Sequence, residues 1–349
     1  MAQKPTADAI RSARKEDPKT RDRDFANRMG ITEAELVAAH MGHGVRAIDP
    51  HPDRLMPAVS RLGEVMALTR NESAVHERVG TYGEYHSGAH AAMVLGKEID
   101  LRIFPKHWVY GFAIEQETDS GLRRTLQVFD AAGDAVHKIF MRDGSDHDAW
   151  AGVVDELAIS GSDTLSVTPR ADVEGAKENP AKRDILMSEW AKMTDTHQFM
   201  RLTAKLGINR LGAYRMVAGE EWVQPLDAGV AQPLLEKIAE TRQEVILFVG
   251  NHGNIQIHWG PLDNIKMMGP WLNVLDARFD LHLRSDHIAE VYAVRKPTKR
   301  GTALSVEMFD ASGMLIAQVF GQRMGEDEDL SLWEDIVGGL RSKTLEPAQ

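Results

Sequence analysis

The chain contains no cysteine in its 349 residues. This absence excludes disulfide bonds, a thiolate nucleophile, an iron–sulfur cluster and a cysteine-ligated zinc site. A sequence without thiols fits a reducing compartment. Metal binding in this chain would therefore use ligands other than thiolates.

Long hydrophobic runs are also missing. No stretch approaches the roughly 20 apolar residues of a membrane-spanning helix, and the polar residues 1–23 lack the apolar segment of a signal peptide. We therefore expect no membrane insertion. The net charge of −11 argues against nucleic acid as a primary partner, which would require a basic face. An anionic ligand would need a local basic pocket to overcome this general negative field.

Familiar catalytic motifs are absent as well. No strand-linked G-x-G-x-x-G and no P-loop is present. The nearest approach to H-E-x-x-H is His86 to His90, where Ser87 holds the glutamate position and Glu84 lies outside the motif. The two histidines would form a metal site if they lay on a helix, but Gly88 favours a loop. A metal hydrolase is thus the less favoured alternative.

The sequence repeats itself, with four pairs of matching segments in the same order. We conclude that the chain is two copies of one unit of roughly 170 residues, 1–165 and 166–349. The matches are Ile99–Phe104 with Phe279–Arg284 and Val128–Gly133 with Met308–Gly313, both 180 positions apart, then Met29–Thr32 with Leu206–Asn209 (177), and Trp150 with Trp333 (183).

Each copy begins with helical patterns and continues with short β-branched and aromatic segments. The pattern predicts an α+β fold: a tandem duplication of a unit in which helices lie beside a large antiparallel sheet. The two Phe-Asp-Ala-x-Gly segments, 129–133 and 309–313, are typical of hairpin turns. A short helix is expected around each repeated tryptophan, and residues 160–182 read as the linker. The predicted helices are about 21–40, 52–69, 184–192, 195–206 and 230–242, and the predicted strands Trp108–Ile114, Thr125–Phe129, Val136–Met141, Val245–Val249, Ile288–Val294, Ala303–Phe309 and Met314–Phe320.

One of these helices, 195–206, carries the histidine of greatest interest, His197. Asp195 is an N-cap residue type, Gln198 is placed to reach back as in a capping box, and Gly207 is a typical C-terminal cap. His197 lies roughly opposite the apolar stripe that begins at Phe199. The helix start favours the neutral imidazole, which is the form that binds a metal.

The repeat provides an internal comparison for the polar positions. Framework residues recur in both copies, whereas several polar residues do not. This pattern is typical of one asymmetric ligand site on a symmetric scaffold, although freely diverging surface positions would also produce it. The unmatched pairs are His197 with Thr20, His282 with Arg102, Gln318 with Lys138, and Arg323 with Asp143.

Three segments together resemble one family: Met193–Phe199, Asp100–Arg102 and Gln318–Arg323. They are similar to the duplicated cytoplasmic heme-handling proteins of bacterial heme uptake, the hemin-degrading factors of the HemS, ChuS and HmuS type. The resemblance covers nearly the whole chain. It implies that heme b sits in the second copy, with His197 as the axial iron ligand and Arg102 of the first copy over the opposite face. It further implies pocket roles for Arg210, Phe248, Lys296, Gln318 and Arg323.

The chemistry of these residue types agrees with a heme site. Heme needs an axial ligand, an apolar lining and cations at its propionates, and the implied residues include each kind. A guanidinium hardly ever loses its proton and is not a usual iron ligand. Arg102 would instead hold a water or dioxygen, and would be catalytic only if the heme is degraded. One departure from the relatives is Ala317, where a tyrosine near the propionates is expected.

Two functions remain open from the sequence. The first is delivery, in which the protein receives heme from a membrane ABC importer and passes it to a protein that uses or degrades it. The second is a heme-oxygenase-like enzyme that opens the porphyrin or releases its iron. Because no flavin or nucleotide motif is visible, an enzyme would need external electrons. The resemblance does not choose between these functions.

Overall fold

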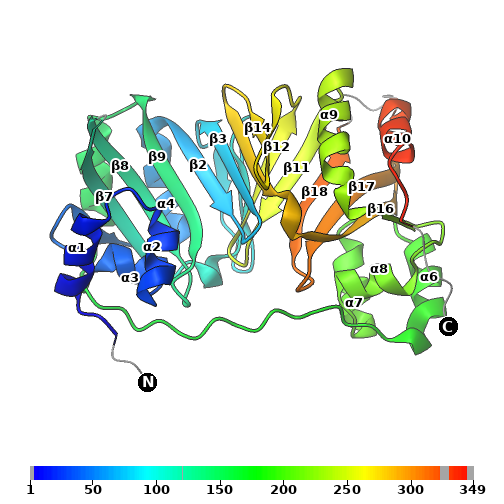
Figure 1. The fold of residues 1–349 in the computed structure, drawn as a ribbon, viewed down its shortest axis with the longest axis horizontal. Helices are drawn as coiled ribbons and strands as arrows, with labels where there is room; N and C mark the ends of the chain where they lie inside the picture. Colours follow the sequence, from blue (N-terminus) through cyan, green and yellow to red (C-terminus); the bar gives the residue numbers. More distant parts are fainter. Residues whose placement is uncertain (1–3, 120, 323–329, 344–349) are drawn as a thin grey trace. The chain divides into compact units, whose positions relative to one another are not determined.

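The computed structural model describes residues 4–119, 121–322 and 330–343. The chain divides into two units, in each of which helices lie beside antiparallel strands (Figure 1). Unit 1 comprises Met1–Arg70, His76–Ala171 and Gly250–Ile257, and unit 2 comprises Asn71–Val75, Asp172–Val249 and His258–Gln349. Each unit therefore includes a short segment from the other half of the chain.

Within its described residues, unit 1 holds two rows of strands and five α-helices. Its first row has the order β1-β7-β8-β9-β2-β3, and its second row is β12-β6-β5-β4. The elements are α1 (Ala7–Glu16), α2 (Asp22–Met29), α3 (Glu33–Ala38), β1 (Val45–Ile48), α4 (Pro52–Val59), β2 (Gly63–Arg70), β3 (Ala74–Gly80), β4 (Glu84–His86), β5 (Ala92–Leu95), β6 (Asp100–Ile103), β7 (Tyr110–Thr118), β8 (Gly121–Phe129), β9 (Ala135–Ser145), α5 (Ala149–Leu157) and β12 (Asn254–Gly260), whose first four residues belong here.

Unit 2 repeats this plan. Its strands follow the order β10-β16-β17-β18-β11, with a second row β15-β14-β13. In the part of the chain that the structure describes, no helix is long and apolar enough to cross a membrane. The elements are α6 (Arg183–Ala191), α7 (Gln198–Leu206), α8 (Arg210–Met216), β10 (Val223–Leu226), α9 (Ala231–Thr241), β11 (Val245–Gly250), β13 (Ile265–Met268), β14 (Trp271–Leu275), β15 (Phe279–Arg284), β16 (Ile288–Thr298), β17 (Gly301–Asp310), β18 (Leu315–Gly321) and α10 (Ser331–Gly338).

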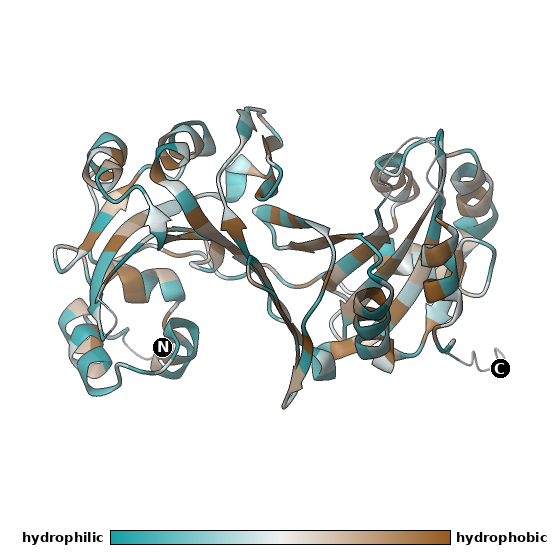
Figure 2. Cartoon of the chain, turned by 90° about the horizontal axis from the view of Figure 1, so that it is seen from above, coloured by the Kyte–Doolittle hydropathy of each residue, from teal (hydrophilic) through white to brown (hydrophobic). Residues whose placement is uncertain are grey.

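Both faces of the central strands in unit 2 are covered by helices. Successive side chains of a strand point to opposite faces, and β16 sends Val291 into one core with α9 and α10. Its neighbour Tyr292 joins a second core with α6, α7 and α8. The strands accordingly carry hydrophobic bands in Figure 2. The α6–α8 face is the one that carries the polar groups described below.

The repeated turns confirm the predicted hairpins. The Asp130 carboxylate accepts hydrogen bonds from the backbone N–H groups of Ala132 and Asp134, both at 2.9 Å. Asp310 does the same in the second copy, from Ser312 at 2.9 Å and Met314 at 3.0 Å. Both loops end in a glycine with positive φ, which other residues rarely adopt. The predicted helices around the two tryptophans are present as α5 and α10.

One predicted helix is wrong over half its length. We expected a helix over 52–69, but it ends after α4, and residues 63–70 form strand β2. Gly63 has a φ of +67°, which stops the helical path. Val65 and Ala67 then enter the core of unit 1. Tertiary packing therefore overrides the local helical pattern here.

Other predictions hold with adjustments. The expected helix over 21–40 is two helices, interrupted at Gly30, which adopts φ +69°. A capping box between Thr32 and Glu35 starts the second helix. The residues from 160 to 182 contain no helix or strand apart from a 3-10 turn at Pro180–Lys182, as expected for a linker. Helices α1 and α8 and several short strands were not predicted.

Unit 1 contains a buried polar cluster around His137, which is 1% exposed. Its ring nitrogens lie 2.9 Å from Thr69 Oγ1 and 2.5 Å from the Tyr82 hydroxyl. Asn254 Nδ2 lies 3.2 Å from the same ring. Burial lowers the pKa of His137 to about 3, although a backbone hydrogen bond opposes the shift. The imidazole is therefore neutral in the folded protein at neutral pH.

This cluster predicts a loss of stability in mild acid. The unfolded chain binds a proton at His137 near pH 6.5 and the folded chain only near pH 3. The contribution of neutral His137 to the free energy of unfolding is therefore fully present above pH 6.5. Between pH 6.5 and pH 3 it falls by about 1.4 kcal/mol for each pH unit. Urea unfolding of wild type and His137→Gln between pH 7 and pH 4 measures the effect. The unfolding free energy of His137→Gln should depend less on pH than that of wild type. His147→Gln, at an exposed histidine, should follow wild type. Equal slopes of unfolding free energy against pH in all three proteins would contradict the assignment.

Candidate functional site

His197 is the N-cap residue of α7, and its side chain is 93% exposed. The Asp195 carboxylate holds it in place through one oxygen. Oδ1 lies 2.7 Å from His197 Nδ1 and accepts the His197 backbone N–H at 2.7 Å. The imidazole is thus presented to the outside in a defined orientation.

The helix begins three residues later than predicted. Residues Asp195 and Thr196 accept i→i+3 hydrogen bonds, so they form a tight turn before α7. The predicted reach-back of Gln198 occurs, but its side chain accepts from the backbone of Thr194, at 2.8 Å, and not from Asp195. The stripe that begins at Phe199 is buried as predicted. Since the histidine lies off this stripe, it does not fill the core of its unit.

The state of Asp195 determines which ring nitrogen of His197 is available. Hydrogen bonds from the backbone and side chain of His197 lower the pKa of Asp195. The carboxylate is therefore ionised at neutral pH and accepts the Nδ1 proton. The lone pair of the neutral imidazole then lies on Nε2. A carboxylate behind one nitrogen is the usual second partner of a metal-binding histidine.

A row of side chains crosses the α6–α8 face of the sheet in unit 2. Phe248 on β11 pairs with Gln318 on β18, and Gln318 pairs with Glu307 on β17. The sheet thus brings together two residues implied by the family, Phe248 and Gln318. The Phe248 ring also meets Phe320 at 5.5 Å between centroids. Ala317 faces the opposite core and is 3% exposed, so its departure from the relatives does not change this row.

Glu307 is the centre of a buried ion cluster. It is fully buried, and Oε1 accepts from Lys296 Nζ at 2.7 Å and from the Ser305 hydroxyl at 2.9 Å. Oε2 accepts from Arg210 Nη1 at 2.7 Å. Lys296 also donates to the hydroxyl of buried Tyr214 at 2.9 Å. Two further residues implied by the family, Arg210 and Lys296, therefore share one carboxylate.

The cluster carries one more positive than negative charge. Burial raises the pKa of Glu307, but the charges of Lys296 and Arg210 outweigh it and hold the pKa well below its usual range. Burial lowers the pKa of Lys296 to about 8 in spite of Glu307. Lys296 is nearly inaccessible, whereas the Arg210 side chain is 24% exposed. Arg210 is therefore the cation through which the surplus charge can meet a ligand.

The matching positions of unit 1 carry no such surplus. Glu33 stands where unit 2 has Arg210, Gln127 where it has Glu307, and Lys138 where it has Gln318. Lys138 and Glu33 form a buried ion pair with each other. At these positions unit 1 therefore has a neutral ion pair, whereas unit 2 has a cluster with a net positive charge. Sequence reasoning missed Glu307, although a glutamate between Val306 and Met308 in a buried strand was a signal.

Arg102 lies on β6 of unit 1 and is half-buried. Its Nη1 donates to the Asp100 carboxylate and, at 3.0 Å, to the backbone carbonyl of Leu101. The counterpart in unit 2, His282, has Nδ1 at 2.7 Å from Asn273 Oδ1. Arg323, which the family resemblance also implies, lies outside the described residues.

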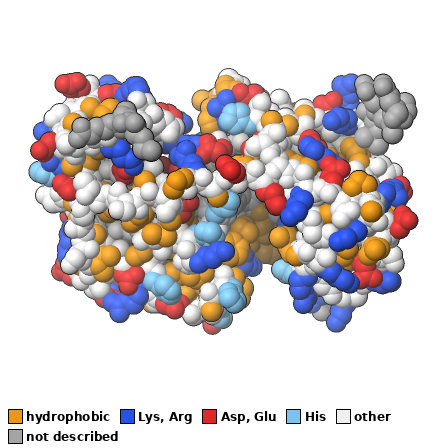
Figure 3. Space-filling view, turned by 90° about the horizontal axis from the view of Figure 1, so that it is seen from below, with side chains coloured by type: hydrophobic (Ala, Val, Ile, Leu, Met, Phe, Trp, Pro, Cys, Tyr) orange, Lys and Arg blue, Asp and Glu red, His pale blue; other side chains and the backbone are white. Residues whose placement is uncertain are grey.

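The alternative metal site at His86 and His90 has no helix to support it. His86 ends β4 and His90 follows in a loop. Within residues 4–119, 121–322 and 330–343, no group of three or more His, Cys, Asp or Glu side chains is arranged to hold a metal ion. Acidic and basic side chains are interspersed on the face drawn in Figure 3.

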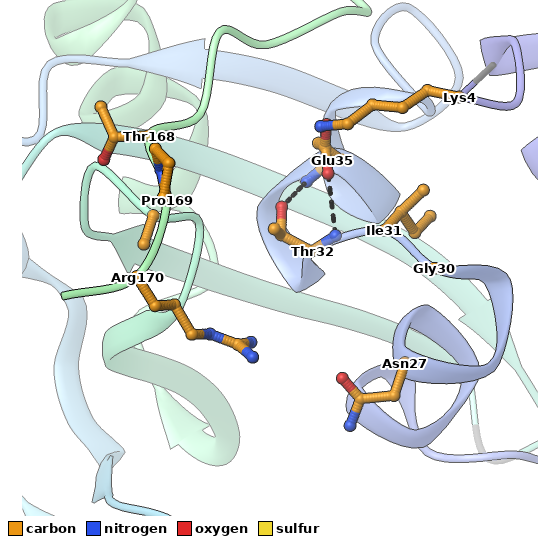
Figure 4. Close-up of a pocket in the computed structure, with 10 residues that line it drawn as sticks. Lys4, Asn27, Gly30, Ile31, Thr32, Glu35, Thr168, Pro169 and Arg170 are labelled. Atoms are coloured by element: carbon orange, nitrogen blue, oxygen red, sulfur yellow. Dashed lines mark hydrogen bonds and ion pairs between the residues drawn. The ribbon is translucent and has the colours of Figure 1, made fainter. Parts of the chain in front are cut away.

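A pocket of about 330 Å³ opens in unit 1 between α3 and the segment around Arg170 (Figure 4). Both cations at its wall are already paired. Arg170 binds Asp134 through two hydrogen bonds of 2.6 Å, and Lys4 binds Glu35. Neither cation is available to anchor an anion without losing its partner, so we do not assign a ligand to this pocket.

The chain is similar to known proteins over nearly its full length. The family profile described as "Haemin-degrading HemS.ChuX domain" matches residues 30–157 and again 207–340, which confirms the predicted duplication. The hemin transport protein HmuS of Yersinia pestis is 36% identical over 334 residues, 95% of this chain and 96% of that protein. Holo-PhuS, a heme-binding protein from Pseudomonas aeruginosa, has a TM-score of 0.91 at 39% identity, covering 97% of this chain and 98% of that one. ChuS, an E. coli heme oxygenase, has a TM-score of 0.84 at 32% identity, covering 94% and 98%.

The ion cluster predicts that Glu307→Gln strongly destabilises the protein. The substitution leaves the buried Lys296 and the partly buried Arg210 without a counter-charge, which costs about 3–5 kcal/mol of unfolding free energy. Glu220→Gln is the matched control, because Glu220 pairs with Arg183 at the surface and its side chain is 43% exposed; it should cost less than about 1 kcal/mol. Urea unfolding measures both. A Glu307→Gln cost as small as that of the control would contradict the charge assignment.

Proposed function

Because the chain belongs to the haemin-degrading HemS.ChuX family, we propose that it is a cytoplasmic heme-binding protein that receives imported heme and delivers it for iron use. The observation that carries this proposal is the exposed imidazole of His197, oriented by Asp195 at 2.7 Å. His197 Nε2 is the axial ligand of the heme iron. The heme b is held on unit 2.

The residues of unit 2 fit the needs of a heme. When bound, heme supplies an iron that takes an axial nitrogen ligand. Asp195 fixes the ring and increases its basicity by holding the Nδ1 proton. Phe248 and Phe320 offer an apolar surface beside Gln318. These groups bind and orient the porphyrin without covalent attachment, so the heme can be released.

The propionates are bound by the cationic side of the same unit. A guanidinium has five N–H donors, so Arg210 can hold Glu307 and a ligand carboxylate together. Lys296 contributes through its charge, because its ammonium is buried against Glu307 and Tyr214. Arg323 is proposed as an additional cation. The neutral Glu33–Lys138 pair of unit 1 supports the assignment of the propionates to unit 2.

Arg102 is proposed as the distal group. Its guanidinium stays charged and does not usually bind iron, so its role is to donate hydrogen bonds to a water or dioxygen on the distal face. The partners are a membrane heme ABC importer as donor and a heme-using or heme-degrading protein as acceptor.

A second candidate function is heme degradation with external electrons. It is favoured by the similarity to ChuS, described as a heme oxygenase. In this case Arg102 stabilises the negative charge that develops on reduced oxygen. The chain carries no flavin or nucleotide motif, so the electrons come from another protein or a small reductant.

We predict that His197→Ala removes most of the change in the Soret band seen when ferric heme is added. The variant has no axial imidazole, so its affinity should fall by at least about tenfold, or 1.4 kcal/mol. Asp195→Asn should keep binding but lower the iron–imidazole bond strength, because the amide is a weaker acceptor. Heme titration and resonance Raman spectroscopy measure the two effects. The matched control is His90→Ala; if His197→Ala binds heme as this control does, His197 is not the ligand.

The two candidate functions differ in the fate of the heme under reduction. Delivery predicts that the loaded protein keeps its Soret band when given a reductant and air in the presence of catalase. Degradation predicts loss of the band, a defined tetrapyrrole product by mass spectrometry, and a slower rate in Arg102→Ala. Persistence of the heme over many hours would reject the enzyme, whereas a product formed with catalase present would reject simple delivery.

A further inference from the structure

Two histidines of unit 1 from distant parts of the sequence lie side by side. His107 ends the 3-10 turn Pro105–His107 after β6, and His252 lies in the turn between β11 and β12. Their ring centroids are 6.1 Å apart, and the ring planes are inclined by 38°. His252 is exposed and His107 is half-buried. Among the described residues, neither ring has a hydrogen-bond or ion-pair partner, so both keep a nitrogen available for a ligand.

The turn that carries His252 is held firmly by hydrogen bonds. Asn251 Oδ1 accepts the backbone N–H of Gly253 at 2.9 Å. The Gly253 carbonyl accepts the backbone N–H of Phe104 at 2.9 Å and the indole N–H of Trp108 at 2.8 Å. Phe104 and Trp108 flank the 3-10 turn, so the two histidines are attached to one frame. Ligands on a rigid frame are preorganised for binding.

Gly253 allows this close approach of the two turns. A Cβ atom at this position would lie 2.6 Å from Val136 Cγ1 and 3.2 Å from His107 Cβ. The backbone of the second turn therefore packs directly against His107. A flat macrocycle could not enter between two turns in contact, so a ligand shared by both imidazoles has to be small.

Unit 2 has the same turn with different chemistry. Asn71 Oδ1 accepts the backbone N–H of Ser73 at 2.9 Å, as Asn251 does for Gly253. The Ser73 hydroxyl lies 3.1 Å from Nδ1 of His287, which therefore has a partner within the protein. The pair of imidazoles is thus particular to unit 1. The corresponding positions, 180 apart, are His107 with His287, His252 with Glu72, and Gly253 with Ser73.

The charges around the pair keep His107 in the form that binds metals. Burial, together with the charges of Lys106 and His252, lowers the pKa of His107. Its ring is therefore neutral at neutral pH, with a free lone pair. Asp130 acts in the opposite direction, raising the pKa of His107, and His252 lowers the pKa of Asp130. A carboxylate thus lies near both rings and offsets part of an added positive charge.

We infer that His107 and His252 together bind a divalent transition-metal ion. Imidazole nitrogen suits zinc, copper, nickel and iron. Each Zn–N bond is about 2.0–2.1 Å long, so two rings on one ion have centroids roughly 5–6.5 Å apart. The observed 6.1 Å falls in this range. The ion would connect the 3-10 turn to the β11–β12 turn.

The number of ligands indicates an open site that exchanges its metal. In the part of the chain that the structure describes, no three His, Cys, Asp or Glu side chains are grouped to hold an ion. Two imidazoles are thus the only protein ligands, and water completes the tetrahedron. Asp130 contributes charge alone, because its carboxylate caps the hairpin turn. The inference does not depend on heme or on His197.

The test titrates Zn²⁺ into the untagged, heme-free full chain after treatment with a chelator. Wild type is compared with His107→Ala, His252→Ala and the control His43→Ala, by calorimetry and by competition with a zinc-binding dye. His43 is the matched control, because it is an exposed histidine in another turn of unit 1. Circular dichroism and urea unfolding check the fold of each variant.

The expected result is that either His107→Ala or His252→Ala lowers the Zn²⁺ affinity at least about tenfold, since even indirect partners of a metal ligand contribute about 10–100-fold. His43→Ala should bind as wild type does. Heme titration should be unchanged in all three variants. The inference is overturned if only one of the two substitutions lowers the affinity, or if neither does.

A second measurement on wild type does not require a variant to fold. Diethyl pyrocarbonate modifies accessible histidines, and mass spectrometry locates the modified residues. Zn²⁺ should slow the modification of both His107 and His252 and leave that of His43 unchanged. Equal modification rates with and without Zn²⁺ would overturn the inference, and heme binding through His197 would be unaffected by that outcome.

Discussion

The buried carboxylate of Glu307 is the point on which the architecture of unit 2 depends. It joins Lys296 of β16 and Arg210 of α8, which are far apart in the sequence. Burying three charges is costly, and such clusters persist only when every partner is in place. Here the cluster fixes α8 on the sheet and leaves a surplus positive charge at the partly buried Arg210 side chain. The same contacts therefore stabilise the fold and prepare the unit for an anionic ligand.

Duplication explains how a mostly acidic protein can carry such a site. Both units keep the framework, as the paired glycines at 30 and 207 and the hairpins at Asp130 and Asp310 show. The polar positions on that framework differ between the units. Unit 2 has a cationic cluster and an oriented imidazole, whereas unit 1 has a neutral ion pair in place of the cluster and carries Arg102 on a separate strand. Binding chemistry thus differs between units that share one fold.

Part of this structure was predictable from the sequence. The repeated hairpin turns, the helices around Trp150 and Trp333 and the buried apolar stripe of α7 were predicted, because they are local or periodic features of the sequence. The strand at residues 63–70 was not predicted, because its sequence has a helical pattern but its apolar side chains pack as a strand in the core of unit 1. The role of Glu307 also escaped prediction, since its partner Arg210 is 97 residues away. Asp195 was identified as a cap, but its contact with the imidazole required the three-dimensional turn.

The central claim is that iron binds Nε2 of His197 while Asp195 keeps the proton on Nδ1. A crystal structure of the heme-loaded full chain tests it most directly. The account predicts iron bonded to Nε2, the Asp195 contact retained, and a propionate at Arg210. Iron bonded to another residue, with the His197 ring left free, would contradict it.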